Sequence, residues 1–319
     1  MSQHRDPQTA PHPMTRRDVV AGAAAAGAAL ALSPSAAGAA GAAAPWFRVS
    51  LAEWSLHRTL WKPAAEGGIS NLEFPGFAKS RCGVDAIEYV NAFFKSPGPD
   101  GQPVARGHDF GYLEDLRGAV QDAGVESLLI MVDGEGLLGD DDEGRRRDAV
   151  ENHFKWIAAA AYLGCHSIRV NAGGEGEASA VAARCADSLR RLARVGDGYD
   201  VNVIVENHGG LSSDGAWLAG VMRAADHPRV GTLPDFGNFY EYDRYQGVED
   251  LMPFAKAVSA KTYDFDASGN ETKIDYARML DIVKTAGYRG WIGIEYEGQD
   301  GDEVKGIVAT RKLLERLNG

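Results

Sequence analysis

The sequence contains little cysteine, and the cysteines follow no pattern. Its 319 residues include Cys82, Cys165 and Cys185, an odd number without a CxxC pair. These cysteines predict neither a disulfide framework nor a zinc-thiolate site, and we expect them to be small buried core residues. A GxGxxG pattern after an early strand is also missing, so nothing in the sequence indicates a dinucleotide site.

Basic residues are outnumbered by acidic ones. The chain has 33 Lys and Arg against 45 Asp and Glu, a formal net charge of −12 at pH 7. A surface of that sign repels phosphate backbones, which argues against binding to nucleic acid and to anionic membranes. This charge favours a neutral or metal-bridged small molecule as the partner.

The beginning of the chain differs in composition from the rest. An arginine pair in Thr15 to Val20 (TRRDVV) precedes a mildly apolar stretch rich in Ala and Gly. This layout is typical of a twin-arginine export signal, with cleavage expected after Ala39 or Ala42; a low-complexity tail is the alternative. The stretch is too short and too weakly apolar for a stable membrane anchor. We therefore predict an export signal and flexible segment over 1–44, one barrel domain over 45–319, and a periplasmic or secreted protein without membrane insertion.

Short apolar runs alternate with amphipathic stretches along the rest of the chain. Eight β-like runs are expected, namely Arg48 to Trp54, Ala86 to Asn91, Ser127 to Asp133, Ser167 to Asn171, Val201 to Asn207, Val230 to Asp235, Ala257 to Thr262 and Trp291 to Tyr296. Apolar residues at helical spacing predict helices that include Arg145 to Leu163, Ala178 to Val195, Trp217 to Ala225 and Tyr276 to Ala286. This alternation over about 270 residues favours an α/β fold with a single-domain (β/α)₈ TIM barrel, and a doubly wound open sheet is the alternative.

Three carboxylates stand at the ends of apolar runs in the second half of the chain. Glu206 ends VNVIVE, Asp235 ends VGTLPD, and Glu295 lies in WIGIEYEG. An apolar run that stops at an acid and a glycine is typical of a barrel strand that opens into an active-site loop. Each acid alone is as well explained as a helix N-cap or a loop ion-pair partner. Together, on one rim of a barrel, they predict an oxygen-rich pocket for a divalent cation.

Four segments resemble a known family in their order and spacing. The segments are VIVENHGG, LPDFGNF, VSAKTYDF and AGYRGWIGIEYEG. They are similar to the xylose isomerase-like barrel superfamily of sugar phosphate isomerases and epimerases, and the resemblance is specific in the last four strands and weak in the first three. It implies a sugar substrate and a barrel that holds Mn²⁺, Mg²⁺, Co²⁺ or Zn²⁺ between a Glu, an Asp, a His and a Glu on strands five to eight. Dimers and tetramers are common among similar barrels, which leaves a homo-oligomer open.

Carried over by position, the resemblance assigns three metal ligands and leaves the fourth open. Glu206, Asp235 and Glu295 match the ligands of strands five, six and eight. Where the family often has His-x-Lys on strand seven, this chain has Ser-Ala-Lys at 259–261, and Asn238 stands where epimerases have a further His. Because two imidazoles are missing, the donor set is richer in oxygen and chemically harder, which favours Mn²⁺ or Mg²⁺ over Zn²⁺.

The resemblance also implies how the residues act. In related epimerases the glutamates of strands five and eight remove and return the proton next to a carbonyl through an enediolate, which assigns catalysis to Glu206 and Glu295. Lys261 or His208 is expected to polarise an oxygen or relay a proton, although an ion pair explains Lys261 equally well and an exposed turn would explain His208. Candidate substrate contacts are Arg169, Asn171, His208, Lys261 and Asn238.

Two other functions remain open. If the carbon beyond the carbanion bears a leaving group, the same first step gives a lyase or dehydratase acting on keto-sugars or 3-keto-glycosides. The other alternative is an exported carbohydrate-binding barrel without catalytic activity. Export argues against a phosphorylated substrate. An AP endonuclease of the same superfamily is disfavoured because its metal cluster needs many histidines, and this chain has eight in total.

Overall fold

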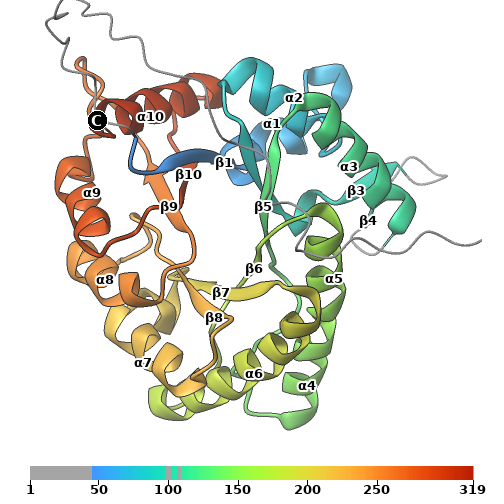
Figure 1. Ribbon diagram of the computed structural model, residues 1–319, viewed down its shortest axis with the longest axis vertical. Coiled ribbons are helices and arrows are strands. Elements are labelled where there is room, and N and C mark those ends of the chain that lie inside the picture. The colour runs from blue at the N-terminus through green and yellow to red at the C-terminus, as the bar shows by residue number, and fades with distance from the viewer. Residues whose placement is uncertain (1–44, 98–102, 106–108, 319) are drawn as a thin grey trace, which may run out of the picture. The chain divides into compact units, whose positions relative to one another are not determined.

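A closed parallel barrel forms the centre of the molecule (Figure 1). The computed structural model describes residues 45–97, 103–105 and 109–318. Eight strands make up the sheet: β1 (Arg48–Ala52), β2 (Ala86–Val90), β5 (Glu126–Met131), β6 (Ser167–Val170), β7 (Asn202–Glu206), β8 (Val230–Leu233), β9 (Val258–Thr262) and β10 (Trp291–Tyr296). Their order is β8-β7-β6-β5-β2-β1-β10-β9, and bridges between Asp235 and Ser259 and between Thr232 and Ala255 join the two ends. The predicted barrel is confirmed.

Helices surround the barrel on its outside (Figure 1). The longer helices are α3 (Phe110–Ala123), α4 (Glu143–Asn152), α5 (Phe154–Leu163), α6 (Ala178–Tyr199), α7 (Gly215–Ala225), α8 (Arg244–Leu251), α9 (Tyr276–Thr285) and α10 (Glu303–Leu317). Short helical turns are η1 (Glu53–Leu56), α1 (His57–Trp61), η2 (Ala64–Glu66), α2 (Phe74–Phe77), η3 (Ala78–Cys82), η4 (Asn91–Phe93), η5 (Gly210–Ser213) and η6 (Met252–Phe254). A separate antiparallel pair, β3 (Lys95–Pro97) and β4 (Pro103–Ala105), precedes α3. Within the described residues, no helix combines the length and the apolar character needed to span a membrane.

The helix predicted over Arg145 to Leu163 is wrong as one unit, because the structure divides it at His153. The Nδ1 atom of His153 lies 2.7 Å from the carbonyl oxygen of Ala149, which a continuous helix would bond to the His153 N–H. That N–H bonds to Val150 O instead, at 3.2 Å. A tightened turn therefore separates α4 from α5.

Strand alternation sorts the side chains into two environments. Val205, Ala260 and Ile294 pack into the main apolar core towards the helices. Their neighbours Glu206 and Lys261 therefore point into the barrel, since successive strand residues face opposite sides. A smaller apolar cluster fills part of the barrel interior, made of Ala52, Val90, Phe93, Leu129, Met131, Ile204, Leu233 and Ala257. The three cysteines are free and buried, as expected.

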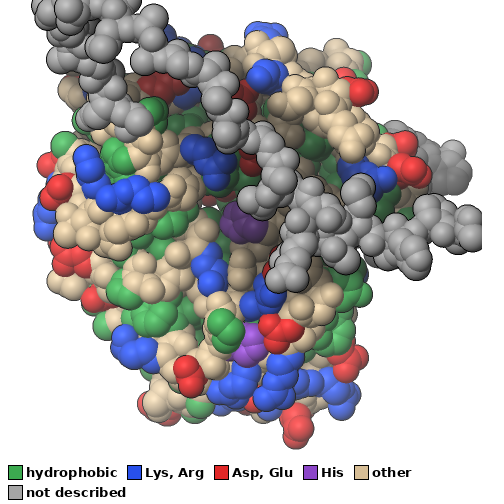
Figure 2. All heavy atoms as spheres, viewed as in Figure 1, with side chains coloured by type: hydrophobic (Ala, Val, Ile, Leu, Met, Phe, Trp, Pro, Cys, Tyr) green, Lys and Arg blue, Asp and Glu red, His purple; other side chains and the backbone are tan. Residues whose placement is uncertain are grey.

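Acidic and basic side chains are interspersed on the face of the molecule that Figure 2 shows. The predicted export signal over 1–44 lies outside the described residues. Near the start of the described chain, Asn318 Oδ1 accepts hydrogen bonds from the N–H groups of Trp46 (2.9 Å) and Phe47 (3.2 Å). Its Nδ2 donates to Phe47 O at 3.0 Å, so the residues before β1 are held against the end of α10.

Candidate metal centre

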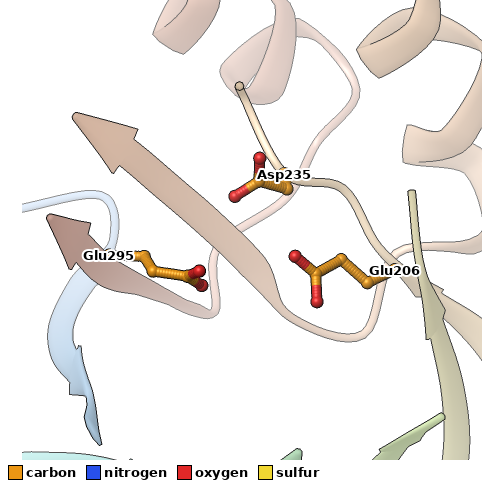
Figure 3. Close-up of side chains that lie close together, drawn as sticks. All are labelled: Glu206, Asp235 and Glu295. Atoms are coloured by element: carbon orange, nitrogen blue, oxygen red, sulfur yellow. The ribbon is translucent and has the colours of Figure 1, made fainter. Parts of the chain in front are cut away.

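Three buried carboxylates meet at the carboxyl ends of the strands. Glu206 is the last residue of β7, Asp235 follows β8, and Glu295 lies in β10. One oxygen from each lies within 4.8 Å of the others, and the side chains point into a common space (Figure 3). The three residues are at most 4% exposed. We call this group the acidic triad.

Asp235 is held by hydrogen bonds on every side. The amide of Asn207 binds its backbone twice, accepting from the N–H at 2.8 Å and donating to the carbonyl at 3.0 Å. Its Oδ1 accepts from the N–H groups of Gly237 and Asn238 at 2.8 and 2.9 Å. Its Oδ2 accepts from Ser259 Oγ at 2.7 Å. The carboxylate is therefore fixed in direction without any ligand.

Ser259 and Asn238, the two residues that stand where the resemblance implies imidazoles, both touch the triad. Ser259 Oγ lies 3.1 Å from Glu295 Oε2 in addition to its contact with Asp235. Asn238 Nδ2 donates to Glu206 Oε1 at 3.1 Å. A hydroxyl and an amide thus orient the carboxylates at these positions, where an imidazole would supply a ring nitrogen.

Two buried cations flank the triad. Lys261 Nζ lies 2.7 Å from Glu295 Oε1, 3.1 Å from Glu297 Oε2 and 3.9 Å from Asp235 Oδ2. On the other side, Arg169 Nε lies 2.9 Å from Glu206 Oε2. These two atoms are close but poorly aligned, and neither makes a hydrogen bond, so the contact is electrostatic.

Arg169 also anchors a neighbouring acid. Its Nη1 donates to Asp133 Oδ1 at 2.7 Å, and Asn171 Nδ2 donates to the same oxygen at 2.6 Å. Although burial acts to raise the pKa of Asp133, the Arg169 charge and these hydrogen bonds lower it below its ordinary value. Arg169 therefore ties Asp133 to Glu206.

The pKa values of the three triad carboxylates are shifted in different directions. Burial raises the pKa of Glu206 to about 7, against the opposing effect of Arg169, and burial likewise raises that of Asp235 to about 7, against Lys261. Burial also acts to raise the pKa of Glu295, but the charge and hydrogen bond of Lys261 outweigh it and lower the pKa. Glu206 and Asp235 therefore hold a proton more tightly than ordinary carboxylates, whereas Lys261 favours the ionised form of Glu295.

These donors fit a hard divalent cation. Carboxylate oxygens are the ligands that Mg²⁺ and Mn²⁺ prefer. Glu206 Oε2 is buried and lacks a hydrogen-bond partner among the described residues. The triad could therefore hold such an ion through Glu206, Asp235 and Glu295.

The other residues singled out from the sequence lie around this group. His208 follows β7 and is exposed, and its backbone N–H donates to Ser212 Oγ at 2.9 Å. Its ring is not part of the group whose ligand atoms lie within 4.8 Å. Glu297 was not predicted as a site residue, although the alternating E-Y-E pattern of 295–297 places it on the same side of the strand as Glu295.

Aromatic side chains lie beside Glu297. Trp54 Nε1 donates to Glu297 Oε1 at 2.6 Å, and the Trp54 ring stacks on His57 with 4.9 Å between centroids. Trp61 makes an edge contact with Trp54 at 5.3 Å. A cavity of about 270 Å³ is lined by His57, Tyr263, Lys273, Glu297, Gly298 and Gln299. Space for a small molecule therefore adjoins the Glu297 end of the centre.

A parallel eight-stranded barrel surrounded by helices is a TIM barrel, and here it carries a buried acidic triad that could hold a divalent cation. The chain belongs to the xylose isomerase-like TIM barrel family, whose model matches residues 78–317.

Individual proteins show more limited similarity. Over 49 residues, which are 15% of this chain and 14% of the other, the chain is 43% identical to the C-glycoside deglycosidase alpha subunit of Arthrobacter globiformis. The structure of a 3-keto-D-glucoside 4-epimerase from E. coli superimposes with a TM-score of 0.65 at 16% identity, covering 85% of this chain and 99% of that one. A probable 3-DHS dehydratase from Bacillus anthracis gives a TM-score of 0.62 at 16% identity, covering 84% and 99%. At these identities the structural matches show a shared fold.

Proposed function

We propose that this protein is a divalent-metal-dependent sugar isomerase or epimerase. The observation that carries the proposal is the acidic triad, in which Glu206 and Glu295 face a common space with Asp235 between them (Figure 3). Membership of the xylose isomerase-like family supports a sugar as the substrate. Mn²⁺ or Mg²⁺ is the metal that an all-oxygen donor set favours.

The chemistry starts at a carbon next to a carbonyl group. The bound cation would stabilise the negative charge that develops on the carbonyl oxygen as an enediolate forms. Glu206 removes the proton from the adjacent carbon, and the electron pair of that C–H bond forms the new carbon–carbon double bond. Glu206 passes this proton to solvent, and Glu295, after taking a proton from solvent, delivers it to the opposite face, which inverts the carbon. Delivery to the neighbouring carbon instead, with loss of the hydroxyl proton from one oxygen and protonation of the other, gives isomerisation.

The flanking residues orient these two acids and the substrate. Asn238 donates to Glu206 Oε1 and so orients that carboxylate. Arg169 and Lys261 place positive charge beside the triad, and Asn171 offers a further donor on the Arg169 side. These donors suit the hydroxyl and carbonyl oxygens of a sugar.

A lyase or dehydratase acting on keto-sugars or 3-keto-glycosides is the second candidate. It shares the proton abstraction, after which the electron pair expels a leaving group from the next carbon. The local similarity to a C-glycoside deglycosidase subunit and the shared fold with a probable dehydratase favour this alternative over a binding protein without catalysis.

Proton exchange tests the proposal directly. We expect the Mn²⁺-loaded protein without residues 1–42 to introduce deuterium from D₂O next to the carbonyl of a free ketose or a 3-keto-glucoside, with the carbon skeleton retained. Glu206→Gln should slow this exchange by about 10² to 10⁴, the usual contribution of a general base. Proton NMR measures both.

The control is Glu241→Gln, which neutralises an exposed acid on the loop after Asp235 and should leave the exchange rate unchanged. Release of the aglycone or of water would replace the isomerase proposal with the lyase. Sugar binding without exchange for any of these substrates would support the binding protein and contradict both enzymes.

We further infer that the protein is exported by the twin-arginine route to the periplasm or beyond. The arginine pair at 16–17 and the small residues that follow support this proposal. Transport of an already folded protein suits a buried metal centre, because the ion can enter before export.

A further inference from the structure

Each of the two buried cations connects the acidic triad to a carboxylate outside it. Arg169 joins Glu206 to Asp133, at 2.9 and 2.7 Å. Lys261 joins Glu295 to Glu297, at 2.7 and 3.1 Å. Glu206 and Glu295 thus share their positively charged partners with carboxylates outside the triad. Each cation therefore has a second carboxylate with which it can pair.

The ammonium group of Lys261 stands where it would compete with a metal ion. It contacts Glu295 and lies 3.9 Å from Asp235, two of the three carboxylates that would hold the ion. A divalent cation bound to the same carboxylates would repel the ammonium group at close range in a buried space. Lys261 must therefore withdraw from Glu295, or the ion binds weakly.

The surroundings of Lys261 favour movement of its ammonium group towards Glu297. Its side chain is 2% exposed, and the wall beside it is tight, since a Cβ atom at Gly237 would lie 2.5 Å from Lys261 Cγ. Among the carboxylates that pair with Nζ in the described residues, Glu297 alone stands outside the triad. Glu297 is itself held by Trp54 Nε1 at 2.6 Å, so it offers a fixed acceptor.

We propose that Lys261 is a displaceable counter-cation of the metal centre and that Glu297 is the positioning residue that receives its ammonium group when a divalent cation binds. The proposal rests on the metal dependence proposed above. Without metal, Lys261 neutralises part of the triad and keeps the carboxylates together. With metal, the Lys261–Glu297 pair frees Glu295 Oε1 as a ligand while the lysine remains charged and buried.

A double-mutant cycle on Mn²⁺ affinity tests this displacement. Glu297→Gln removes the charged acceptor, so Lys261 stays on Glu295, and Mn²⁺ should bind about 10- to 100-fold more weakly, as for other residues that support metal ligands. Lys261→Met should bind Mn²⁺ more tightly than wild type. In the double variant, the loss caused by Glu297→Gln should disappear, because there is no ammonium group left to position. Isothermal titration calorimetry gives the four dissociation constants.

The control is Asp264→Asn, which removes an acid after β9 that pairs with Lys273 and not with Lys261, and should leave Mn²⁺ affinity unchanged. Circular dichroism establishes that each variant folds, and Lys261→Gln replaces Lys261→Met if the latter does not. An equal loss from Glu297→Gln with and without Lys261 would overturn the proposal, since Glu297 would then act through its own charge. Unchanged affinity in Glu297→Gln would also overturn it while leaving the proposed function intact. A wild-type protein that binds no Mn²⁺ would overturn both.

Discussion

Glu53 is a buried acid that is not part of the acidic triad. It is 0% exposed, its Oε2 accepts from the Val90 N–H at 2.8 Å, and its Oε1 has no hydrogen-bond partner among the described residues. Burial raises the pKa of Glu53 well above that of an ordinary glutamate, and the Val90 hydrogen bond opposes this only in part. The titratable groups that interact with it are Tyr89 and Tyr112, whose own pKa values burial raises.

This burial makes stability depend on pH. The folded protein holds the Glu53 proton more tightly than the unfolded chain, so its contribution to stability is present below the unfolded pKa of about 4.5 and is lost as pH rises through the folded pKa. Glu53→Gln keeps a neutral acceptor for Val90, so its stability relative to wild type should increase with pH by up to about 1.4 kcal/mol per pH unit in that window. Urea unfolding between pH 4 and pH 8 measures the difference. A pH-independent difference would contradict it.

The sequence indicated some residues of the centre and missed others for a physical reason. Glu206, Asp235 and Glu295 could be predicted because each ends an apolar run at the rim where parallel strands meet. Glu297 and Ser259 were not assigned, because their contacts with Lys261 and Asp235 depend on the packing of β9 against β10 and on closure at β8. Arg169 was expected to contact the substrate, and its pairing with both Asp133 and Glu206 depends on distances between three strands.

At the scale of elements, helices α7 and α8 pack closely against each other where Gly215 meets Gly247. A Cβ atom at Gly215 would lie 2.7 Å from Gly247 Cα, so the first turn of α7 has no room for a side chain. Gly220, in the middle of the same helix, has nothing within 4 Å of the equivalent position. Close packing therefore requires glycine at 215, whereas the space around Gly220 would accept a side chain.

Alanine substitutions at these glycines should have opposite effects. Gly215→Ala forces α7 away from α8 and should lower the free energy of unfolding by about 1–3 kcal/mol, as overpacking does. Gly220→Ala gains helix propensity without a clash and should raise it by about 0.5–1 kcal/mol. Urea midpoints of both variants test this pair. Equal destabilisation by both would contradict the difference in space that the structure shows at Gly215 and Gly220.

The strands were easier to predict than the helices. Every predicted strand coincides with an observed one, since a buried parallel strand is a short continuous apolar run. The break at His153 was missed because apolar spacing continues across it, and only the competition of its ring for the Ala149 carbonyl interrupts the helix. The β3–β4 pair lies outside the barrel and does not follow its periodic pattern.

At the scale of the whole molecule, the barrel closes around its own ends. The first strand of the barrel, β1, pairs in parallel with the last, β10. Asn318 also forms hydrogen bonds with Trp46 and Phe47, so these contacts between the two ends of the barrel involve no residue before 45. Cleavage after Ala39 or Ala42 would leave these contacts intact. The folded barrel is thus compatible with removal of the proposed export signal.

Export can be separated from folding by changing the arginine pair. Arg16→Lys together with Arg17→Lys keeps the positive charge but removes the pattern that the twin-arginine route recognises, so the protein should accumulate in the cytoplasm with its precursor length. Because neither residue belongs to the barrel domain, the retained protein should keep the Mn²⁺ affinity of the wild type. Cell fractionation with immunoblotting measures location, and calorimetry on the purified precursor measures affinity. Export of this variant in normal amounts would contradict the twin-arginine assignment, whereas weakened Mn²⁺ binding would mean that residues 1–44 contribute to the metal centre.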